Sequence, residues 1–399
     1  MVFSSLSFII IFLPIVLLFY YLCPKKYQNI ILLVFSLLFY YIGEQKYIII
    51  MLTSSLIAYI SGLLIDKSKN HKHKKIILII FIILDILILG YFKYFNFLLE
   101  SINYIFNTNY ESLNIILPIG ISFYTFQALS YVIDIYRGAE VQKNYINFAT
   151  YLTFFPQLIA GPIVRYEDIR KEITNRSFDS FDFARGIERF CIGLSKKVLL
   201  SNVLAEFLNI YMNTSNHTFI LSWITGLVIP LQIYFDFSGY SDMAIGLGRM
   251  FGFHFIENFN YPLISKSATE FWHRWHISLG TWFRDYIYIP LGGNRVKVSR
   301  HILNILLVWT LTGLWHGAAY NFIIWGLYYG VLLILEKYLY GKFLEKHSFI
   351  SHIYFIIITI IGFEIFNATS LLSLSKTLLE LFGIGTNGFT NILTNYYIK

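Results

Sequence analysis

The chain has 399 residues, of which 56% are hydrophobic and only 14% are charged, and its formal net charge is +8. A soluble domain carries about 25% charged residues, so this composition excludes an ordinary water-soluble globular protein. Two cysteines are also too few for a disulfide scaffold or a multi-cysteine zinc site.

Long apolar blocks recur along the chain and predict membrane-spanning helices. A straight helix needs roughly 20 apolar residues to cross a bilayer, and fewer where it is short or re-entrant. The blocks lack the strict alternation of β-barrel strands and are too long for them. We therefore predict an all-α polytopic membrane protein with about 9–11 membrane segments. The blocks are Leu6–Leu22, Asn29–Ile42, Tyr47–Ile65, Ile76–Leu99, Tyr145–Ile159, Leu221–Phe235, Ile302–Leu314, Phe322–Leu335 and Ile353–Phe366.

Residues 1–110 are typical of a scaffold of apolar helices joined by short loops. No basic residue precedes Leu6–Leu22 and no small-residue cleavage site follows it, so we expect a retained membrane helix there. The loop at Lys25–Lys26 and the run DKSKNHKHKK at 66–75 are basic, whereas the loop GEQK between them is neutral. The positive-inside rule then places the basic loops in the cytoplasm and the N-terminus outside. We interpret the basic run as the flank of a membrane helix rather than a nucleic-acid site.

The sequence changes character after residue 110. The segments LPIGISFYTFQALSYVIDIYRG (117–138) and FFPQLIAGPIVRYEDIRKEITNR (154–176) combine apolar runs with Pro and Gly. Such breaks at membrane depth are tolerated only where the backbone is buried in protein or lines a wet cavity. We therefore predict a catalytic core over 111–335 and C-terminal helices over 336–399, within one domain.

Residues 230–295 combine many charged side chains with membrane-like apolar and aromatic content. Polar residues in such a place usually face a bundle interior or a water-filled path. We expect short, partly buried helices here, because potential helix breakers recur along the segment. These breakers are Gly239, Gly252, Pro262 and Gly280.

The basic side chains of this segment could hold phosphates or a carboxylate. The alternative is a belt of arginines and aromatics at the membrane interface. Glu270 and Arg274 are four residues apart, so they can also pair on one helix face. The basic cluster comprises Lys266, Arg274, Arg284 and Arg295.

One histidine, His316, lies in the middle of the apolar stretch VWTLTGLWHGAAYNFIIWG (308–326). Burial in an apolar layer disfavours the charged imidazolium, so we expect a neutral ring. A neutral imidazole is a competent general base if a substrate proton comes within reach. Gly313 and Gly317 leave room beside the ring, and Trp309 and Trp315 could wall the site. The alternative is a histidine hydrogen-bonded to a neighbouring helix.

A second candidate is His276, in the stretch FWHRWHISLGTWFRDY. His273 lies one turn earlier, and two histidines at this spacing could ligate a metal. No carboxylate or cysteine completes a set at the usual spacing, so we expect no metal site. P-loop, dinucleotide-binding and G-x-S-x-G motifs are absent from the chain.

Three motifs, in this order along the chain, resemble the signature of the membrane-bound O-acyltransferase family. They are YFDFSGYSDMAIGLGRMFGF, NFNYPLISKSATEFWHRWHISLGTWFRDYIYIPLGGNR and LTGLWHGAAYNFIIWG. The resemblance covers most of the chain and is greatest to bacterial members that O-acetylate alginate, peptidoglycan or other exported glycans. It implies a helical bundle in the bacterial cytoplasmic membrane, with short re-entrant helices around a central tunnel.

The resemblance also implies roles for individual residues. The histidine of the LWHG element corresponds to His316, and that of RWHISL corresponds to His276, so both are predicted to be catalytic. The donor would be a cytoplasmic acyl thioester such as acetyl-CoA, with no bound cofactor. The acceptor would be an exported glycan, reached through a periplasmic SGNH-type acetyltransferase or esterase; we expect membrane lipids but no nucleic acid as partners. The predicted substrate-binding residues are Asp236, Trp315, Arg274, Arg284, Asp285 and Asn304.

Two other functions stay open. The same family transfers D-alanine from a carrier protein to teichoic acid. A transporter or flippase without chemistry would also have broken helices and buried charges, although no matching pair of interrupted segments favours it here. The segment IGFEIFNATS departs from the family pattern, because Asn367 replaces an arginine and Glu364 lies inside the segment.

Overall fold

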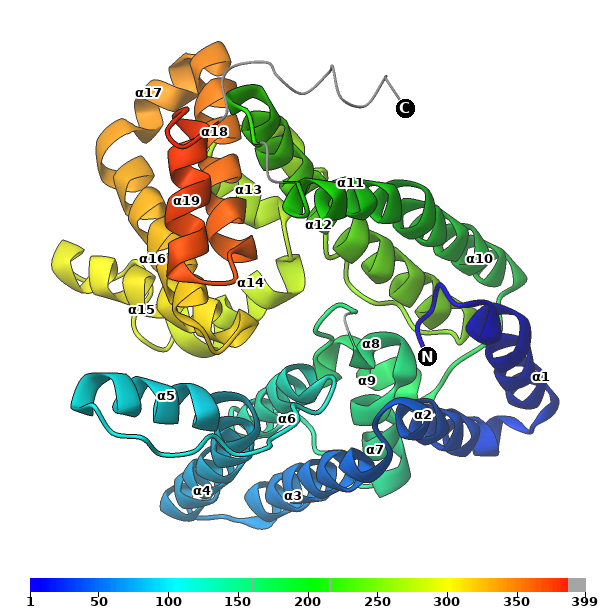
Figure 1. Ribbon diagram of the computed structural model, residues 1–399. Coiled ribbons are helices and arrows are strands. Elements are labelled where there is room, and N and C mark those ends of the chain that lie inside the picture. Colours follow the sequence, from blue (N-terminus) through cyan, green and yellow to red (C-terminus); the bar gives the residue numbers. More distant parts are fainter. Residues whose placement is uncertain (160, 215–216, 387–399) are drawn as a thin grey trace. The chain divides into compact units, whose positions relative to one another are not determined.

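A computed structural model describes residues 1–159, 161–214 and 217–386, and within these ranges the chain is helical with no β-strand (Figure 1). Helices satisfy their own backbone hydrogen bonds, which a chain in lipid requires. The predicted all-α membrane fold is confirmed. By length and composition, five helical segments of the described part can cross a membrane, and Ser7–Leu22 is a shorter apolar helix. The five are Lys25–Lys67, His71–Phe106, Phe219–Met250, Tyr320–Lys346 and Ser348–Asn367.

The chain divides into two compact units, each described here by itself. Unit 1 comprises Met1–Leu194 and Tyr240–Glu257, and unit 2 comprises Ser195–Gly239 and Asn258–Lys399. Helix α12 (Phe219–Met250) continues without a break through Gly239, so the interruption predicted there is wrong. The turn predicted at Gly252 is confirmed by its φ of +79°. The prediction of one functional domain stays a prediction.

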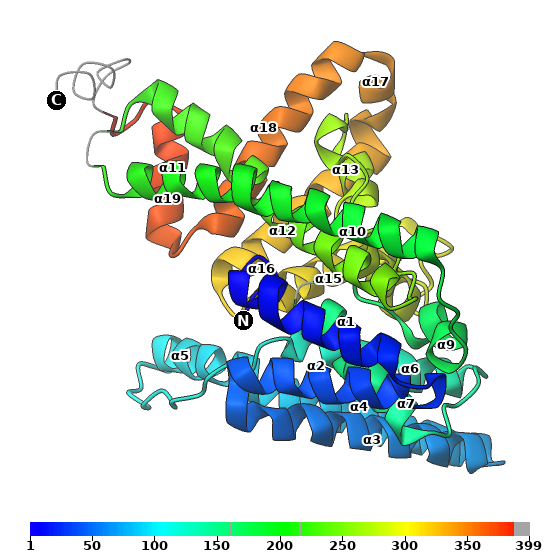
Figure 2. The ribbon, with the colours of Figure 1, turned by 90° about the vertical axis from the view of Figure 1, so that its right-hand side faces the viewer.

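Unit 1 is built around α3, which packs against α4, α6 and α7. Helices α2, α3 and α4 run side by side in Figure 2. Two of these helices begin at asparagines whose side chains accept backbone N–H groups: Asn70 before α4 and Asn144 before α7. The helices are α1 (Leu13–Leu22), α2 (Gln28–Glu44), α3 (Ile48–Lys67), α4 (His71–Leu89), α5 (Phe95–Phe106), α6 (Ile121–Tyr136), α7 (Tyr145–Thr153), α8 (Phe155–Leu158), α9 (Tyr166–Thr174) and α10 (Ser180–Ser195).

Unit 2 is built on the pair α15 and α16, with α18 packed on α16 and α19 on α18. Its core is rich in aromatic rings, among them Phe271, Trp275, Trp325, Tyr329 and Phe363. Beside α12, the helices are α11 (Asn202–Met212), α13 (Ala268–Arg274), α14 (Ile277–Phe283), α15 (Val298–His316), α16 (Tyr320–Leu335), α17 (Gly341–Lys346), α18 (Ser348–Asn367) and α19 (Leu371–Leu381).

Short 3₁₀ and π-helical turns join or extend these helices. The 3₁₀ turns are Lys25–Tyr27, Gln45–Tyr47 and Pro262–Ile264, and the π-helical turns are Ser7–Phe12, Gly90–Tyr94, Lys196–Ser201, Arg284–Tyr288 and Glu336–Tyr340.

Glycines allow α15 and α16 to pack backbone to backbone. A methyl group built on Gly326 would overlap the carbonyl oxygen of Trp309, and one on Gly313 would overlap that of Phe322. Small residues permit this close approach of helices in membranes. Because α15 ends at His316, the packing of this pair also fixes where that imidazole lies.

Candidate functional site

His276 lies at a sharp break between two short helices. Helix α13 ends at Arg274, and α14 begins immediately after His276, whose φ is +47°. This left-handed conformation is uncommon outside glycine and asparagine, and such strain is often found at functional sites. The break does not lie at Gly280, which is inside α14, so that predicted interruption is wrong.

A short extended pairing holds the two sides of this break in register. The N–H of Asn260 donates to the carbonyl of Arg274 (2.9 Å), and the N–H of Ile277 donates to that of Asn258 (3.0 Å). This pairing brings the Asn258 side chain against His276, although the two residues are 18 positions apart in the chain.

The contacts of Asn258 define which nitrogen of His276 carries the proton. The Oδ1 atom of Asn258 accepts from the N–H of Ser278 (3.3 Å) and from its hydroxyl (2.9 Å), so this atom is an acceptor. His276 Nδ1 lies 3.1 Å from the same oxygen and therefore donates its N–H to it. In the neutral ring the lone pair is then on Nε2. Nε2 is buried and has no hydrogen-bond partner among the described residues.

The structure brings the two predicted catalytic histidines together. The ring centroids of His276 and His316 are 6.5 Å apart, and Trp315 lies 5.7 Å from His276 and 5.0 Å from His316. Phe237 packs edge-on against His276 at 4.7 Å. His276 is only 2% exposed, and this apolar burial favours the neutral imidazole.

A cavity of about 230 Å³, the histidine pocket, borders His276 but not His316. Its walls are mainly apolar and include Trp272, Leu279 and Trp309. The indole N–H of Trp272 has no partner among the described residues. The lining thus includes two side chains whose buried polar atoms, Nε2 of His276 and Nε1 of Trp272, have no hydrogen-bond partner among the described residues.

A second and larger cavity of about 950 Å³, the lysine pocket, shares part of its wall with the histidine pocket. The shared side chains are Tyr288, Ile305 and Leu333. The lysine pocket is lined by polar groups that include three lysines without an ion pair in the described part of the chain. Such ammonium groups suit phosphate oxygens. The three are Lys266, Lys337 and Lys342.

A buried carboxylate, Glu336, holds α13 in place at the edge of the lysine pocket. It accepts the backbone N–H groups of Ala268 (2.6 Å) and Thr269 (2.8 Å), the Thr269 hydroxyl (2.5 Å) and the Tyr354 hydroxyl (2.9 Å). A negative charge at the N-terminus of a helix is favourable because the N–H groups there lack helical partners. Glu336 thus fixes the helix that carries Trp272.

Three of the predicted substrate-binding residues are charged and lie near His276 in the sequence. Arg284 lines the histidine pocket, where it is paired with Asp285 at 2.7 Å. Arg274 pairs with Glu270 at 3.0 Å, which confirms the predicted helix pair, and lines neither pocket. Asp285 also lies outside both linings.

The other two predicted polar residues have structural partners. Asp236 forms an ion pair with Lys197 at 2.5 Å. Asn304 is buried, and its amide donates to the carbonyls of Leu291 and Gly293, both at 3.2 Å. Neither residue lines the histidine pocket. Their role in binding substrate stays a prediction.

Sequence reasoning missed Asn258, Trp272 and Glu336, whereas Trp309, which was expected as a wall beside His316, lines the histidine pocket. Asn258 and Glu336 contact the site through side-chain oxygens that come from distant parts of the sequence, and no periodic pattern predicts such contacts. Trp272 is part of the aromatic enrichment of its segment, but enrichment alone does not say which rings border a cavity. In the described ranges, no three His, Cys, Asp or Glu side chains come together as metal ligands would.

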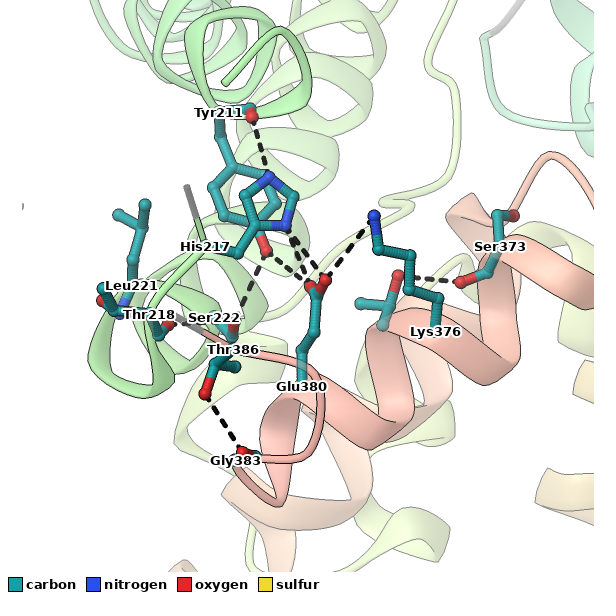
Figure 3. Close-up of polar contacts among 11 residues, drawn as sticks. Tyr211, His217, Thr218, Leu221, Ser222, Ser373, Lys376, Glu380, Gly383 and Thr386 are labelled. Atoms are coloured by element: carbon teal, nitrogen blue, oxygen red, sulfur yellow. Dashed lines mark hydrogen bonds and ion pairs between the residues drawn. The ribbon is translucent and has the colours of Figure 1, made fainter. Parts of the chain in front are cut away.

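A further polar cluster centres on the buried Glu380 of α19 (Figure 3). Its carboxylate contacts His217 Nδ1 (3.0 Å) and accepts from the Tyr211 hydroxyl (3.2 Å), while Lys376 lies at 3.9 Å. Nε2 of His217 faces the carbonyl of Tyr211 at 3.3 Å. Both nitrogens of this ring thus face acceptors, so the cluster ties the turn before α12 to α19 rather than offering a base.

Glu364, which departs from the family pattern in the sequence, is buried in α18.

Comparison with known proteins points to one family. A model of the membrane-bound O-acyltransferase family (MBOAT) matches residues 140–375. The chain is 41% identical over 393 residues to the probable alginate O-acetylase of Pseudomonas aeruginosa, covering 97% of this chain and 76% of that protein. It is 36% identical over 317 residues to the peptidoglycan O-acetyltransferase of Helicobacter pylori (72% and 60% covered). It is 30% identical over 252 residues to the teichoic acid D-alanyltransferase of Bacillus subtilis (59% and 63% covered).

Proposed function

Because this chain belongs to the membrane-bound O-acyltransferase family, we propose that it transfers an acetyl group from a thioester donor toward a hydroxyl of an exported glycan. The protein is a multi-pass membrane O-acyltransferase. The acetyl group and the glycan class follow from its similarity to an alginate O-acetylase and a peptidoglycan O-acetyltransferase.

One observation supports catalysis at the histidine pocket above the others. His276 lines a cavity, its buried Nε2 has no hydrogen-bond partner among the described residues, and Asn258 holds the opposite nitrogen. An imidazole ring held in this way can accept a proton at Nε2. His316 lies beside it, as the LWHG motif implies for a catalytic residue.

The proposed reaction joins the acceptor oxygen to the acetyl carbon. The hydroxyl oxygen attacks the thioester carbonyl as the imidazole pair of His276 and His316 takes its proton. The N–H of Trp272 is available to stabilise the oxygen that becomes negative. The carbon–sulfur bond then breaks, and the proton passes from the imidazole to the departing thiolate. The products are an ester and a free thiol.

The lysine pocket is the proposed place for the phosphates of the donor. Its lysines suit the anionic part of a cytoplasmic acyl thioester such as acetyl-CoA, and the shared wall leads to the apolar histidine pocket. Trp309 and Leu279 then surround the acyl end. We place the protein in the bacterial cytoplasmic membrane with its N-terminus outside, and expect a periplasmic SGNH-type transferase as its partner.

The test measures O-acetyl esters on cell-wall and capsule glycans after the gene is deleted and then restored. We expect deletion to remove one class of acetyl ester, detected by mass spectrometry. The wild type and His352→Ala, which changes an exposed histidine of α18, should restore it, whereas His316→Ala and His276→Ala should not. Loss of D-alanyl esters in place of acetyl esters would assign the chain to teichoic acid modification. Restoration by both active-site variants would contradict catalysis at this site.

A further inference from the structure

A polar cavity of about 350 Å³, the interface pocket, lies in unit 1 where the ends of several helices meet. Tyr21 of α1, Lys25 after it, the loop that precedes α10, and Arg249 at the end of α12 all contribute to its lining. The pocket shares no residue with the histidine or lysine pockets. The proposed acetyl transfer therefore does not explain it.

Part of the charge in the interface pocket is compensated internally. Arg249 pairs with Asp182 at 3.1 Å. His254 contacts Glu172 at 2.7 Å and Asp182 at 2.9 Å. Two of the three carboxylates in the lining are thus engaged.

Three cations of the lining have no carboxylate partner in the described ranges. Arg176 donates only to neutral oxygens, including Asn29 Oδ1 (2.6 Å) and the Tyr20 hydroxyl (3.1 Å). Arg185 lies over the ring of Phe181 at 4.3 Å and is exposed, as is Lys25.

Positive charge is in excess in the lining of the interface pocket. Four lysine and arginine side chains face three carboxylates, and His254 contacts two of those carboxylates as well. A bound anion such as a phosphate group would therefore compensate this excess.

Exposed apolar side chains line the interface pocket or adjoin its lining in the sequence. Phe178 and Phe181 line it and are 61% and 63% exposed, and Tyr21 packs edge-on against Phe178 at 5.2 Å. Leu22, next to Tyr21, is 75% exposed. Aromatic and apolar groups beside a basic pocket are typical of the region where head groups meet acyl chains.

We infer that the interface pocket binds the phosphodiester of a glycerophospholipid, with Lys25 and Arg185 contacting the phosphate and Phe178 and Phe181 contacting the glycerol and upper acyl chains. The positive-inside rule places the Lys25 loop, and hence this lipid, in the cytoplasmic leaflet. The lipid would join the end of α1 to the start of α10.

The test titrates dioleoyl-phosphatidylglycerol into the full chain in detergent and counts bound lipid by native mass spectrometry. Lys25→Gln and Arg185→Gln remove exposed cations that make no ion pair with any described residue, so both variants should fold. Each should weaken the tightest lipid site roughly fivefold, since a basic residue near an anionic lipid contributes about that factor. Lys69→Gln, an exposed lysine outside the pocket, should bind lipid as the wild type does.

Two results would overturn the inference. Equal lipid affinity in the wild type and all three variants would show that the interface pocket does not hold the phosphate. Displacement of the lipid by millimolar inorganic phosphate would assign the pocket to a soluble phosphate compound. Neither readout depends on acetyl transfer, so the inference can fail while the proposed function stands.

Discussion

The close packing of α15 on α16 predicts that Gly326→Ala is strongly destabilising. The added methyl group would overlap the carbonyl oxygen of Trp309, inside normal van der Waals contact by more than about 1 Å. That oxygen belongs to a helix backbone and cannot rotate away as a side chain could. The two helices must therefore separate, and His316 at the end of α15 must move with them.

The magnitude follows from two opposing terms. Overpacking costs about 1–3 kcal/mol in a well-packed core, and a rigid backbone neighbour places this case at the upper end. In the opposite direction, alanine inside a helix is more favourable than glycine by about 0.5–1 kcal/mol of folding free energy. We expect a net loss of about 2 kcal/mol, which lowers the apparent Tm by several degrees, together with a fall in acetyl transfer.

The assay compares three glycines by thermal unfolding in detergent, followed by size-exclusion chromatography. A methyl group on Gly43 would meet nothing within 4 Å, so Gly43→Ala should be neutral or slightly stabilising. One on Gly330 would lie 3.2 Å from Trp309 Cβ, so Gly330→Ala should fall between the other two. If Gly326→Ala unfolds at the same temperature as Gly43→Ala, the description of this helix pair is wrong.

Three further substitutions test the contacts around the site. Asn258→Ala removes the acceptor that orients His276, so kcat should fall about 100-fold with little change in the KM for the donor. An unchanged kcat in a steady-state transfer assay would contradict the role of Asn258. Glu336→Gln weakens the charge-assisted hydrogen bonds to the start of α13 and should lower the free energy of unfolding by about 2 kcal/mol. A melting curve like that of the wild type would argue against this. Glu380→Gln should lower the Tm without changing kcat, because the contacts of Glu380 with His217 hold helices together away from both pockets. A lower kcat with an unchanged Tm would assign the cluster to catalysis.

The helical architecture and the central pair of histidines were predictable from the sequence. Apolar blocks of membrane length leave the backbone few alternatives to helix, so the long elements are recognisable by composition alone. The motifs around His276 and His316 singled out two imidazoles in apolar surroundings. Trp315 was expected beside His316 because it precedes it in the chain, and the structure adds its contact with His276.

The contacts that fix the site were not predictable. Asn258 reaches His276 through an irregular extended pairing and a left-handed residue, and neither has a periodic signature. Polar side chains were expected to face substrate, yet Asp236 and Asn304 have protein partners of their own. The pairing of Arg274 with Glu270 could be predicted because it depends only on helical spacing, whereas that of Asp236 with Lys197 joins separate helical elements.

Release of free thiol from radiolabelled acetyl-CoA by the purified protein tests the central claim most directly. With a soluble glycan fragment as acceptor, the wild type should release thiol and form a labelled ester. A positioned base contributes about 10²–10⁴ to the rate, so His316→Ala and His276→Ala should each lower both signals by that factor in protein that remains folded by size-exclusion chromatography. Wild-type rates in both variants would contradict an active site built on these two imidazoles.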